Sequence, residues 1–377
     1  MRREKTMKTL RVRIVGGSVG GLFAAALLRQ EGHDVRLYER SGGGLAGRGA
    51  GLVGQRDLFA LLRAVGCEHV AHVGVVAHER IFLDRAGEIR QRQATPQMQI
   101  SWDHLYATMR SKVPDDAYVL GRTVLGVEQD ATSASLRFDD GSREEADLVI
   151  GADGLGSIVR CAVVGRHAAN EYAGYVAWRG LVPERDLPAE AAILLDRFAF
   201  YDMPQSHTLG YLVTGPAAET AVGERRYNWV WYRRVAAAEL PALLTDAQGR
   251  HHPYSLAPGQ VPRTLAARLR QDAADLLPPP FAAAIAAEPR PFVQAIFDYE
   301  VPAMTRGRVA LLGDAAFVVR PHTAMGVAKA AGDALALARH LSAHREIEIA
   351  LQAYNEERHP AGAAIAAYGR RLGTMLE

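Results

Sequence analysis

Two short apolar runs with a helical segment between them open the chain. Residues 10–15 and 35–38 are typical of buried strands, and the Ala- and Leu-rich residues 22–30 have helical spacing that ends at Gly32. A glycine-rich turn, residues 16–21, follows the first strand. Strand, glycine turn, helix and strand in this order predict a βαβ unit.

Up to residue 171 the pattern then alternates between helical and strand-like spacing. Asp139-Asp140-Gly141 is typical of a hairpin turn. We expect helices over residues 58–65, 103–112 and 157–164, a hairpin over 79–92 about Ala86-Gly87, and strands over 119–130, 133–138 and 147–150.

Beyond residue 171 the runs become rich in aromatic residues, which strands favour. They cover residues 175–182, 198–203, 208–214 and 227–233 and predict a separate antiparallel sheet. We expect Arg225 and Arg226 to form a solvent-exposed charged turn beside it.

The C-terminal part returns to the first pattern, with a strand over residues 309–312 and an Ala-rich helix over 327–341. The predicted class is therefore α/β: a Rossmann-like domain with a parallel sheet, a second domain with a mostly antiparallel β-sheet, and C-terminal helices. We assign residues 8–75, 100–171 and 292–377 to the first, discontinuous domain, and residues 76–99 and 172–291 to the second.

Composition narrows the class of protein. The 377 residues are 49% hydrophobic and 23% charged, as in ordinary soluble proteins, and the net charge of +2 gives no basis for binding nucleic acid or an anionic membrane. Cys67 and Cys161 have neither metal-ligand nor disulfide-scaffold spacing. No apolar run reaches the roughly 18 residues of a membrane span. We expect a cytoplasmic protein without a metal site.

The glycine turn has the chemistry of a dinucleotide site. Glycines let the backbone approach a pyrophosphate, whose charge rests at the helix N-terminus, and Glu39 can accept hydrogen bonds from ribose hydroxyls. Ser18 holds the second glycine position, where its hydroxyl is small enough for close approach. The alternative is a set of glycines that serve only a tight turn.

Two further segments are candidates for ligand contacts. Arg48, in the glycine-rich loop over residues 41–51, either neutralises a phosphate or is a solvated arginine of a surface loop. Asp153 and Gly154 end a buried strand at the sheet edge where α/β proteins bind ligands.

The strand exit at Gly313-Asp314 is a second nucleotide-handling element. Asp314 can accept a hydrogen bond from a ribityl hydroxyl of a flavin, and backbone amides of residues 324–327 can donate to the pyrimidine end of its ring. A positive helix N-terminus would favour the anionic reduced ring. A capped strand-to-helix turn explains this segment alone, but explains three such segments along one chain poorly.

These three segments, residues 16–21 with Glu39, residues 151–154 and residues 313–321, resemble the fingerprints of single-component FAD-dependent aromatic hydroxylases of the p-hydroxybenzoate hydroxylase type. Their order covers essentially the whole chain. Residues 173–180 and Arg320-Pro321-His322, followed by Lys329, resemble the 2,6-dihydroxypyridine 3-hydroxylase branch of that family.

The resemblance implies noncovalent FAD on the first domain, NADH or NADPH as reductant, and O2, which forms a flavin C4a-hydroperoxide that hydroxylates a small electron-rich aromatic substrate, a pyridine or phenol. The expected FAD-binding residues are Gly16, Gly17, Ser18, Val19, Gly21, Glu39, Arg40, Arg48, Gln55, Asp153, Gly154, Asp314, Pro321, Ala324, Met325, Gly326 and Val327.

Four positions depart from the family pattern. Ala324, Met325 and Ala328 stand where glycine, glutamine and asparagine are common, and Ser101 stands where many members have a flavin-contacting arginine. We therefore expect the flavin contacts there to come from backbone groups.

His322 is the candidate for accepting the substrate's proton, because histidine titrates near neutral pH. The alternative is a histidine that only shapes its loop. Tyr211 and Tyr232 are further pocket candidates, and Arg179 either holds an acidic substituent or is paired inside the sheet.

A flavin-binding redox protein or oxidoreductase of the same fold without hydroxylase activity is the alternative function. A flavin halogenase would need a Trp-x-Trp-x-Ile-Pro run, which the segment starting at Trp229 does not continue, and a dehydrogenase would not need Asp314. A homodimer is compatible with the sequence.

Overall fold

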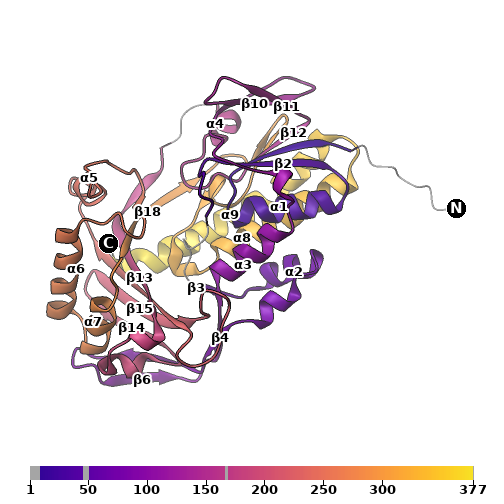
Figure 1. The fold of residues 1–377 in the computed structure, drawn as a ribbon. Helices are drawn as coiled ribbons and strands as arrows, with labels where there is room; N and C mark the ends of the chain where they lie inside the picture. The colour runs from indigo at the N-terminus through magenta and orange to yellow at the C-terminus, as the bar shows by residue number, and fades with distance from the viewer. Residues whose placement is uncertain (1–8, 46–50, 166–168, 377) are drawn as a thin grey trace.

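A six-stranded sheet forms one part of the molecule (Figure 1). All of its neighbouring strands are parallel except the edge pair β19 and β20. In spatial order the strands are β19 (Thr305–Arg306), β20 (Val309–Leu311), β12 (Leu148–Gly151), β1 (Arg11–Val15), β2 (Asp34–Glu39) and β8 (Tyr118–Leu120). The computed structural model describes residues 9–45, 51–165 and 169–376.

Helices from both ends of the chain pack together against this sheet. The first, α1 (Val19–Gln30), is apolar around most of its surface and is buried over nearly its whole length. It packs on α8 (Gly326–Ala343), which also contacts α2 (Arg56–Ala64) and the long α9 (Ile347–Gly373). Figure 1 shows the indigo α1 beside the yellow C-terminal helices.

A nine-stranded sheet forms the other part. Its neighbours are antiparallel except for the parallel pair β14 and β5. The order is β17 (Ser255–Leu256), β18 (Phe292–Glu300), β13 (Glu171–Pro183), β16 (Arg226–Arg234), β15 (Ser206–Val213), β14 (Arg197–Met203), β5 (Glu79–Leu83) and β6 (Ile89–Gln93), with β21 (Phe317–Val318) attached to β18.

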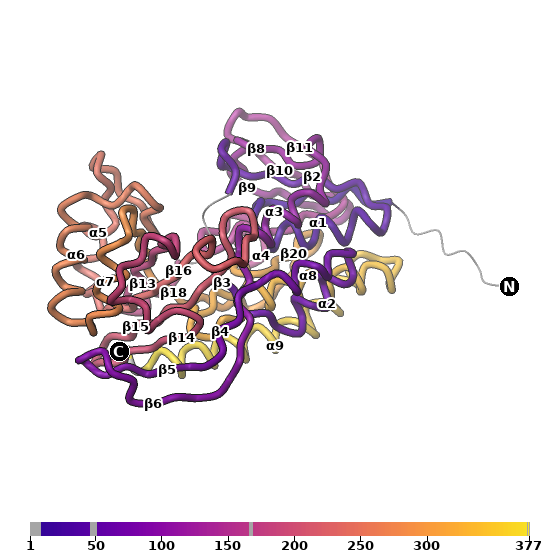
Figure 2. The backbone as a smooth tube through the Cα atoms, turned by 60° about the horizontal axis from the view of Figure 1, so that its bottom comes forward, coloured from indigo at the N-terminus to yellow at the C-terminus, as the bar shows by residue number. Residues whose placement is uncertain are grey.

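The two faces of this sheet have different surroundings. On one face, Trp229 and Trp231 pack in a core with residues of α6 (Arg263–Leu276) and α7 (Pro279–Ala286). Figure 2 shows these helices and α5 (Leu240–Leu243) on the side away from the parallel sheet. The other face, which we call the inner face, carries Tyr175 and Tyr232. Because side chains alternate along strands, the same face receives every second residue of β13, β15 and β16.

Two small sheets and two more helices complete the fold. β3 (Gly51–Val53), β7 (Gln97–Ser101) and β4 (Val75–Ala77) form one sheet, which the sequence pattern did not predict. The other contains β9 (Val124–Gln129), β10 (Ala134–Phe138) and β11 (Arg143–Ala146). The helices are α3 (Trp102–Ser111) and α4 (Arg160–Val164).

Three local predictions were wrong. Residues 119–130 form two strands in different sheets, because Gly121, at φ +68°, turns the chain between β8 and β9. The helix expected from residue 157 begins at Arg160, since Asp153 accepts the amides of Ile158 and Val159.

Arg225 and Arg226 are the third wrong prediction, because neither is a solvated turn residue. Arg225 is buried and donates to Glu184, with an Nε–Oε2 distance of 2.8 Å, and also pairs with Asp196. Arg226 pairs with Asp103 at 3.1 Å.

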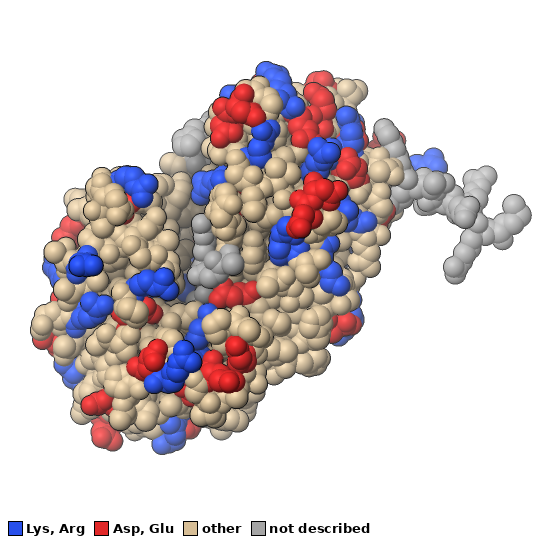
Figure 3. Space-filling model, viewed as in Figure 1, with Lys and Arg blue, Asp and Glu red and all other residues tan. Residues whose placement is uncertain are grey.

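Charge is spread over the surface visible in Figure 3, where basic and acidic side chains alternate without a large patch of one sign. Within the described residues, no helix has the length and apolar character needed to span a membrane.

Candidate active site

The glycine turn after β1 is shaped by close backbone contacts. Gly16 has φ +109°, and a Cβ there would lie 2.3 Å from the carbonyl oxygen of Ala152, so no other residue fits without displacement. A Cβ at Gly21 would lie 2.0 Å from the oxygen of Gly16. The turn therefore brings α1 directly against the ends of β1 and β12.

Glu39 fixes this turn from the end of β2. Its Oε2 accepts the amide of Gly17 at 2.9 Å, and its Oε1 accepts the amide of Ser41 at 2.9 Å. The carboxylate is buried, yet it lines a cavity. Glu39 thus holds the loop shape and presents negative charge where ribose hydroxyls would need an acceptor.

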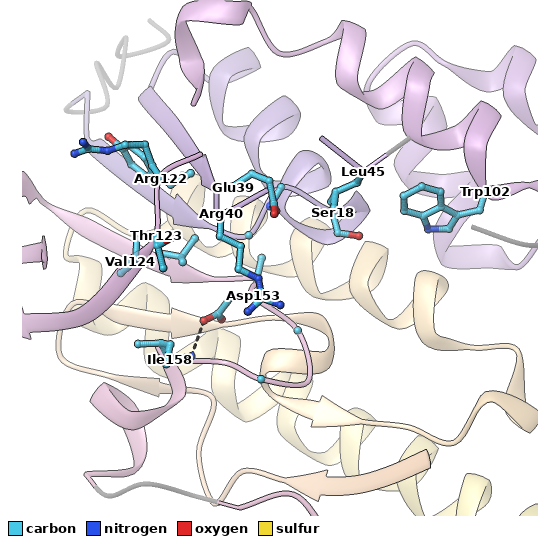
Figure 4. A pocket seen from close by; sticks show the side chains of 17 residues that line it. Ser18, Glu39, Arg40, Leu45, Trp102, Arg122, Thr123, Val124, Asp153 and Ile158 are labelled. Carbon is cyan, nitrogen blue, oxygen red and sulfur yellow. Dashed lines mark hydrogen bonds between the residues drawn. The ribbon is translucent and has the colours of Figure 1, made fainter. Parts of the chain in front are cut away.

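The cavity has a volume of about 290 Å³ and opens over the turn (Figure 4). Five segments that are separate in sequence meet in it. Ser18 forms no side-chain cap on α1, so the first amides of that helix have no side-chain partner there. The expected residues that line the cavity are Gly16, Gly17, Ser18, Glu39, Arg40, Asp153 and Gly154. Trp102 and Arg122 also line it and were not predicted.

Asp153 organises the loop after β12. Its carboxylate accepts the hydroxyl of Ser157 at 2.6 Å and the amide of Ile158 at 2.7 Å. Burial raises its pKa, and these hydrogen bonds oppose the rise. Figure 4 shows Arg40 extending toward this carboxylate.

Arg160 connects this loop with the C-terminal one. Its guanidinium donates to the carbonyl oxygens of Ala315 at 2.8 Å and of Asp314 at 3.0 Å, and to Asn170 Oδ1 at 2.9 Å. It also packs 3.9 Å from the ring centroid of Tyr299. Arg160 was not among the residues predicted from the sequence, although the spacing of Asp153, Ser157 and Arg160 was a visible signal.

Asp314 lies in the turn after β20 beside a buried charge cluster. Its side chain is 50% exposed, and its Oδ1 is 3.9 Å from Nζ of Lys329. Lys329 is fully buried and is equally far from Asp333 Oδ2, without a hydrogen-bond partner in the described part of the chain. Asp333 is in turn fixed by Arg358 at 2.8 Å. A buried cation therefore lies beside the Asp314 carboxylate, and half of the Asp314 side chain remains exposed.

The segment before α8 forms a short turn that starts at Pro321. Thr323 Oγ1 accepts the amide of Met325 at 3.0 Å, and Gln55 Nε2 donates to the oxygen of Ala324 at 3.1 Å. Ala324 adopts the left-handed conformation at φ +52°. No side chain caps α8, so the amides of Gly326 and Val327 are available to an anionic group.

Two histidines and two tyrosines form a cluster near this turn. Nε2 of His322 is 2.9 Å from the hydroxyl of Tyr175, and its ring centroid is 4.3 Å from that of Tyr232. His207 stacks on Tyr232 with centroids 6.0 Å apart and hydrogen-bonds through Nδ1 to Asp202. His207 was not among the expected site residues.

The ring of His322 is neutral over the physiological range. Burial, followed by the charges of His207, Arg320 and Arg179, lowers its pKa from 6.5 to about 3. Tyr211 lies on the same sheet face and donates to the oxygen of Gly51 at 3.2 Å. Arg48 lies outside the described residues.

Two family models match the chain: an FAD binding domain-like model over residues 172–298 and an FAD binding domain model over residues 293–368. The 2,6-dihydroxypyridine 3-monooxygenase of Paenarthrobacter nicotinovorans is 33% identical over 377 residues, which cover 98% of this chain and 92% of that protein. The chain belongs to the FAD-dependent monooxygenases.

Other matches agree with this family. The 6-hydroxynicotinate 3-monooxygenase of Pseudomonas fluorescens is 27% identical, covering 92% of the monooxygenase described here and 87% of the relative. The solved structure of 2,6-dihydroxypyridine-3-hydroxylase from Arthrobacter nicotinovorans has a TM-score of 0.91 and 31% identity, over 98% of this chain and 93% of that one. These relatives do not favour the alternative of a flavin protein without hydroxylase activity.

The residues of the monooxygenase fit FAD chemically. The glycine turn and the N-terminus of α1 suit a pyrophosphate, and Glu39 suits a ribose. Asp314 offers an acceptor for a ribityl hydroxyl, and the uncapped α8 offers amides for the polar edge of the ring. The parallel sheet, the mostly antiparallel sheet and the C-terminal helices confirm the predicted fold class.

Proposed function

We propose that this monooxygenase uses NADH or NADPH and O2 to hydroxylate a small electron-rich aromatic compound, a hydroxylated pyridine or a phenol. The observation that carries the proposal is the cluster of Tyr175, His207, Tyr232 and His322 next to the turn before α8. Flat aromatic walls with a few hydrogen-bonding groups suit a small aromatic ring. Two relatives support the pyridine class, because their names state action on 2,6-dihydroxypyridine and 6-hydroxynicotinate.

In this proposal three segments of the chain bind different parts of FAD. We assign the ADP half of FAD to the cavity over the glycine turn, with Glu39 toward the ribose and Arg40 toward phosphate. Asp314 takes the ribityl chain, and the amides of Gly326 and Val327 take the ring. When bound and reduced, the flavin supplies the activation of O2 that lets one oxygen atom reach the substrate.

The role proposed for His322 is to hold the hydroxyl proton of the substrate. Its ring is neutral, so one nitrogen can accept a hydrogen bond while the other donates. The hydroxyl of Tyr175 occupies Nε2, which leaves Nδ1 as the atom for the substrate. Tyr211 and Tyr232 line the same face and exclude water.

The domain division follows from these roles. Residues 8–75, 100–171 and 292–377 form the FAD-binding domain of this proposal, and residues 76–99 and 172–291 form its substrate domain. No second glycine fingerprint is present in the sequence, so the nicotinamide nucleotide binds without a Rossmann domain of its own. A homodimer and a cytoplasmic location stay predictions, which size-exclusion chromatography and cell fractionation test.

The experiment is a substrate panel with the FAD-loaded protein. NADH and NADPH oxidation is measured with 2,6-dihydroxypyridine, 6-hydroxynicotinate and simple phenols, and the products are analysed by mass. We expect at least one compound to accelerate nucleotide oxidation and to gain one oxygen atom. Accelerated oxidation in which no compound gains oxygen would contradict hydroxylation.

A further inference from the structure

Arg179 is a cation without a counter-charge on the inner face of the nine-stranded sheet. It lies on β13 opposite Val230 of β16, on the same face as Tyr175 and Ala177. Its Nε is buried and has no hydrogen-bond partner within the described ranges. No carboxylate of those ranges forms an ion pair with its guanidinium. The pairing inside the sheet that the sequence suggested is therefore not what the structure shows.

Arg179 acts electrostatically on neutral side chains of the cluster. Its charge acts on His322, Tyr211 and Tyr232, where it lowers the pKa of each or opposes its rise. Two carboxylates of this face are engaged elsewhere: Asp298, on the neighbouring strand β18, pairs with Arg320, and Asp202, on β14, is hydrogen-bonded by His207. Asn228 lies on the same face, fully buried, and both atoms of its amide lack a partner in the described chain.

Arg179 is half-buried, and it cannot remove its charge by losing a proton, because guanidinium stays charged in proteins. An uncompensated buried charge is costly, and so is a buried amide without hydrogen bonds. The unpaired guanidinium, half-buried beside the aromatic cluster of the site, indicates that an anionic ligand completes its contacts. The guanidinium fork matches a planar oxyanion.

We infer that Arg179 binds the oxyanion of the substrate, so that the substrate class is an anionic hydroxylated aromatic, bound through an ionised ring oxygen or a ring carboxylate. This inference rests on the proposed function and narrows it. The same contact has two consequences. It selects anions over neutral rings, and an ionised ring oxygen raises the electron density of the ring carbons that are to be hydroxylated.

With Arg179 in this role, His322 need not act as a strong base. A histidine with its pKa lowered to about 3 is a weak base at neutral pH. A cation that stabilises the ionised substrate makes a strong base unnecessary, so it is enough that Nδ1 of His322 accepts the hydrogen bond of the substrate's hydroxyl. Arg179 is in this sense a specificity-determining residue that touches the substrate.

The test compares Arg179→Met and Arg179→Lys with a matched control, Arg233→Met. Arg233 lies on the neighbouring strand and pairs with Asp272 of α6 at 2.6 Å, on the opposite face. Dissociation constants of 2,6-dihydroxypyridine and 6-hydroxynicotinate are measured by their effect on the absorbance of bound flavin, across the pH range in which each compound ionises. The carboxylate compound and the dihydroxy compound distinguish the two kinds of oxyanion.

We expect Arg179→Met to weaken anion binding by about 10- to 100-fold, since a hydrogen bond to a charged group is lost. Wild-type binding should tighten as the compound ionises, and this dependence should vanish in Arg179→Met and persist in Arg179→Lys and Arg233→Met. The flavin content should not change. The ligand-free Arg179→Met protein should be at least as resistant to urea as wild type, because it lacks the unpaired charge.

Equal affinity of wild type and Arg179→Met for both anions would overturn the inference, and so would a wild type that binds neither anion at any pH. If instead the proposed function is wrong, the result differs: the anion still binds in a way that depends on Arg179, but it is recovered without an added oxygen atom.

Discussion

The guanidinium of Arg160 donates to the backbone oxygen of Asp314 at 3.0 Å, across 154 positions of sequence. The same side chain bonds the oxygen of Leu155 at 3.3 Å in the loop after β12. One buried cation thus connects the Asp153 loop, beside the cavity proposed for the ADP half of FAD, with the Asp314 turn, beside the proposed ribityl position. For this reason the segments at residues 151–154 and 313–321 form a single structural unit.

Replacing Arg160 with Met should loosen this unit. The change removes the donors to at least two buried carbonyl oxygens, and we expect a loss of about 2–4 kcal/mol in the free energy of unfolding. FAD affinity should fall as well, because both loops contribute to its site. Urea unfolding of the ligand-free protein and titration with FAD measure the two effects. Arg143→Met, in an exposed pair with Glu128, is the control and should change neither.

Ala324→Gly should stabilise the protein. Ala324 has φ +52°, a conformation that costs an L-residue about 1–2 kcal/mol and glycine almost nothing. The greater flexibility of glycine in the unfolded chain offsets part of this gain, so we expect a net increase of about 0.5–1 kcal/mol. Thermal unfolding tests it. Ala338→Gly in the interior of α8 should have the opposite sign, by about 1 kcal/mol. A loss of stability in Ala324→Gly would mean that its methyl group makes contacts worth more than the strain.

His322→Asn should slow hydroxylation without reducing flavin content. The ring contacts Tyr175 and Tyr232 in the substrate cluster, whereas none of its contacts involves the glycine turn. We expect kcat for hydroxylation to fall by about 10-fold or more. More of the nucleotide oxidation should become uncoupled from product. Tyr175→Phe removes the partner of Nε2 and should give a smaller effect in the same direction. Unchanged rate and coupling in His322→Asn would remove this residue from the mechanism.

The stability of the protein at mildly acid pH should depend on His322. Its pKa is about 3 in the folded protein and 6.5 as the ordinary value, so the unfolded chain takes up a proton in this window while the folded protein does not. Stability is therefore full above about pH 6.5 and falls as the pH is lowered toward 3, by at most about 1.4 kcal/mol per pH unit from this group. Urea unfolding at several pH values should show a shallower fall in His322→Asn. Parallel curves for the two proteins would contradict the lowered pKa.

Sequence patterns predicted the parts of the fold that rest on local periodicity. The βαβ unit around Gly16, the hairpin about Gly87 and the aromatic strands of the large sheet all follow from spacing and turn residues. Contacts between distant segments could not be predicted in this way. Arg225 looks like part of a charged turn until Glu184 is brought beside it, and Arg160 gains its role only when Asp314 is folded against it.

In the candidate site, too, local features could be predicted from the sequence and contacts between distant segments could not. The cavity over the glycine turn was expected from the motif, because backbone geometry there is local. His207 was missed, since its importance comes from stacking on Tyr232 across the sheet. The lack of a partner for Arg179 was equally invisible, because only the folded sheet shows which carboxylates stay out of reach.

The central claim, that this chain transfers one oxygen atom from O2 to a hydroxylated aromatic ring, is tested most directly by isotope labelling. The FAD-loaded protein is supplied with heavy-isotope O2, with NADH or NADPH as reductant, and with 2,6-dihydroxypyridine or 6-hydroxynicotinate as substrate. The mass of the product is then measured by mass spectrometry. We predict a product that carries one heavy oxygen atom, formed in step with nucleotide oxidation. Recovery of unlabelled starting material together with hydrogen peroxide, for every compound that accelerates nucleotide oxidation, would contradict the account.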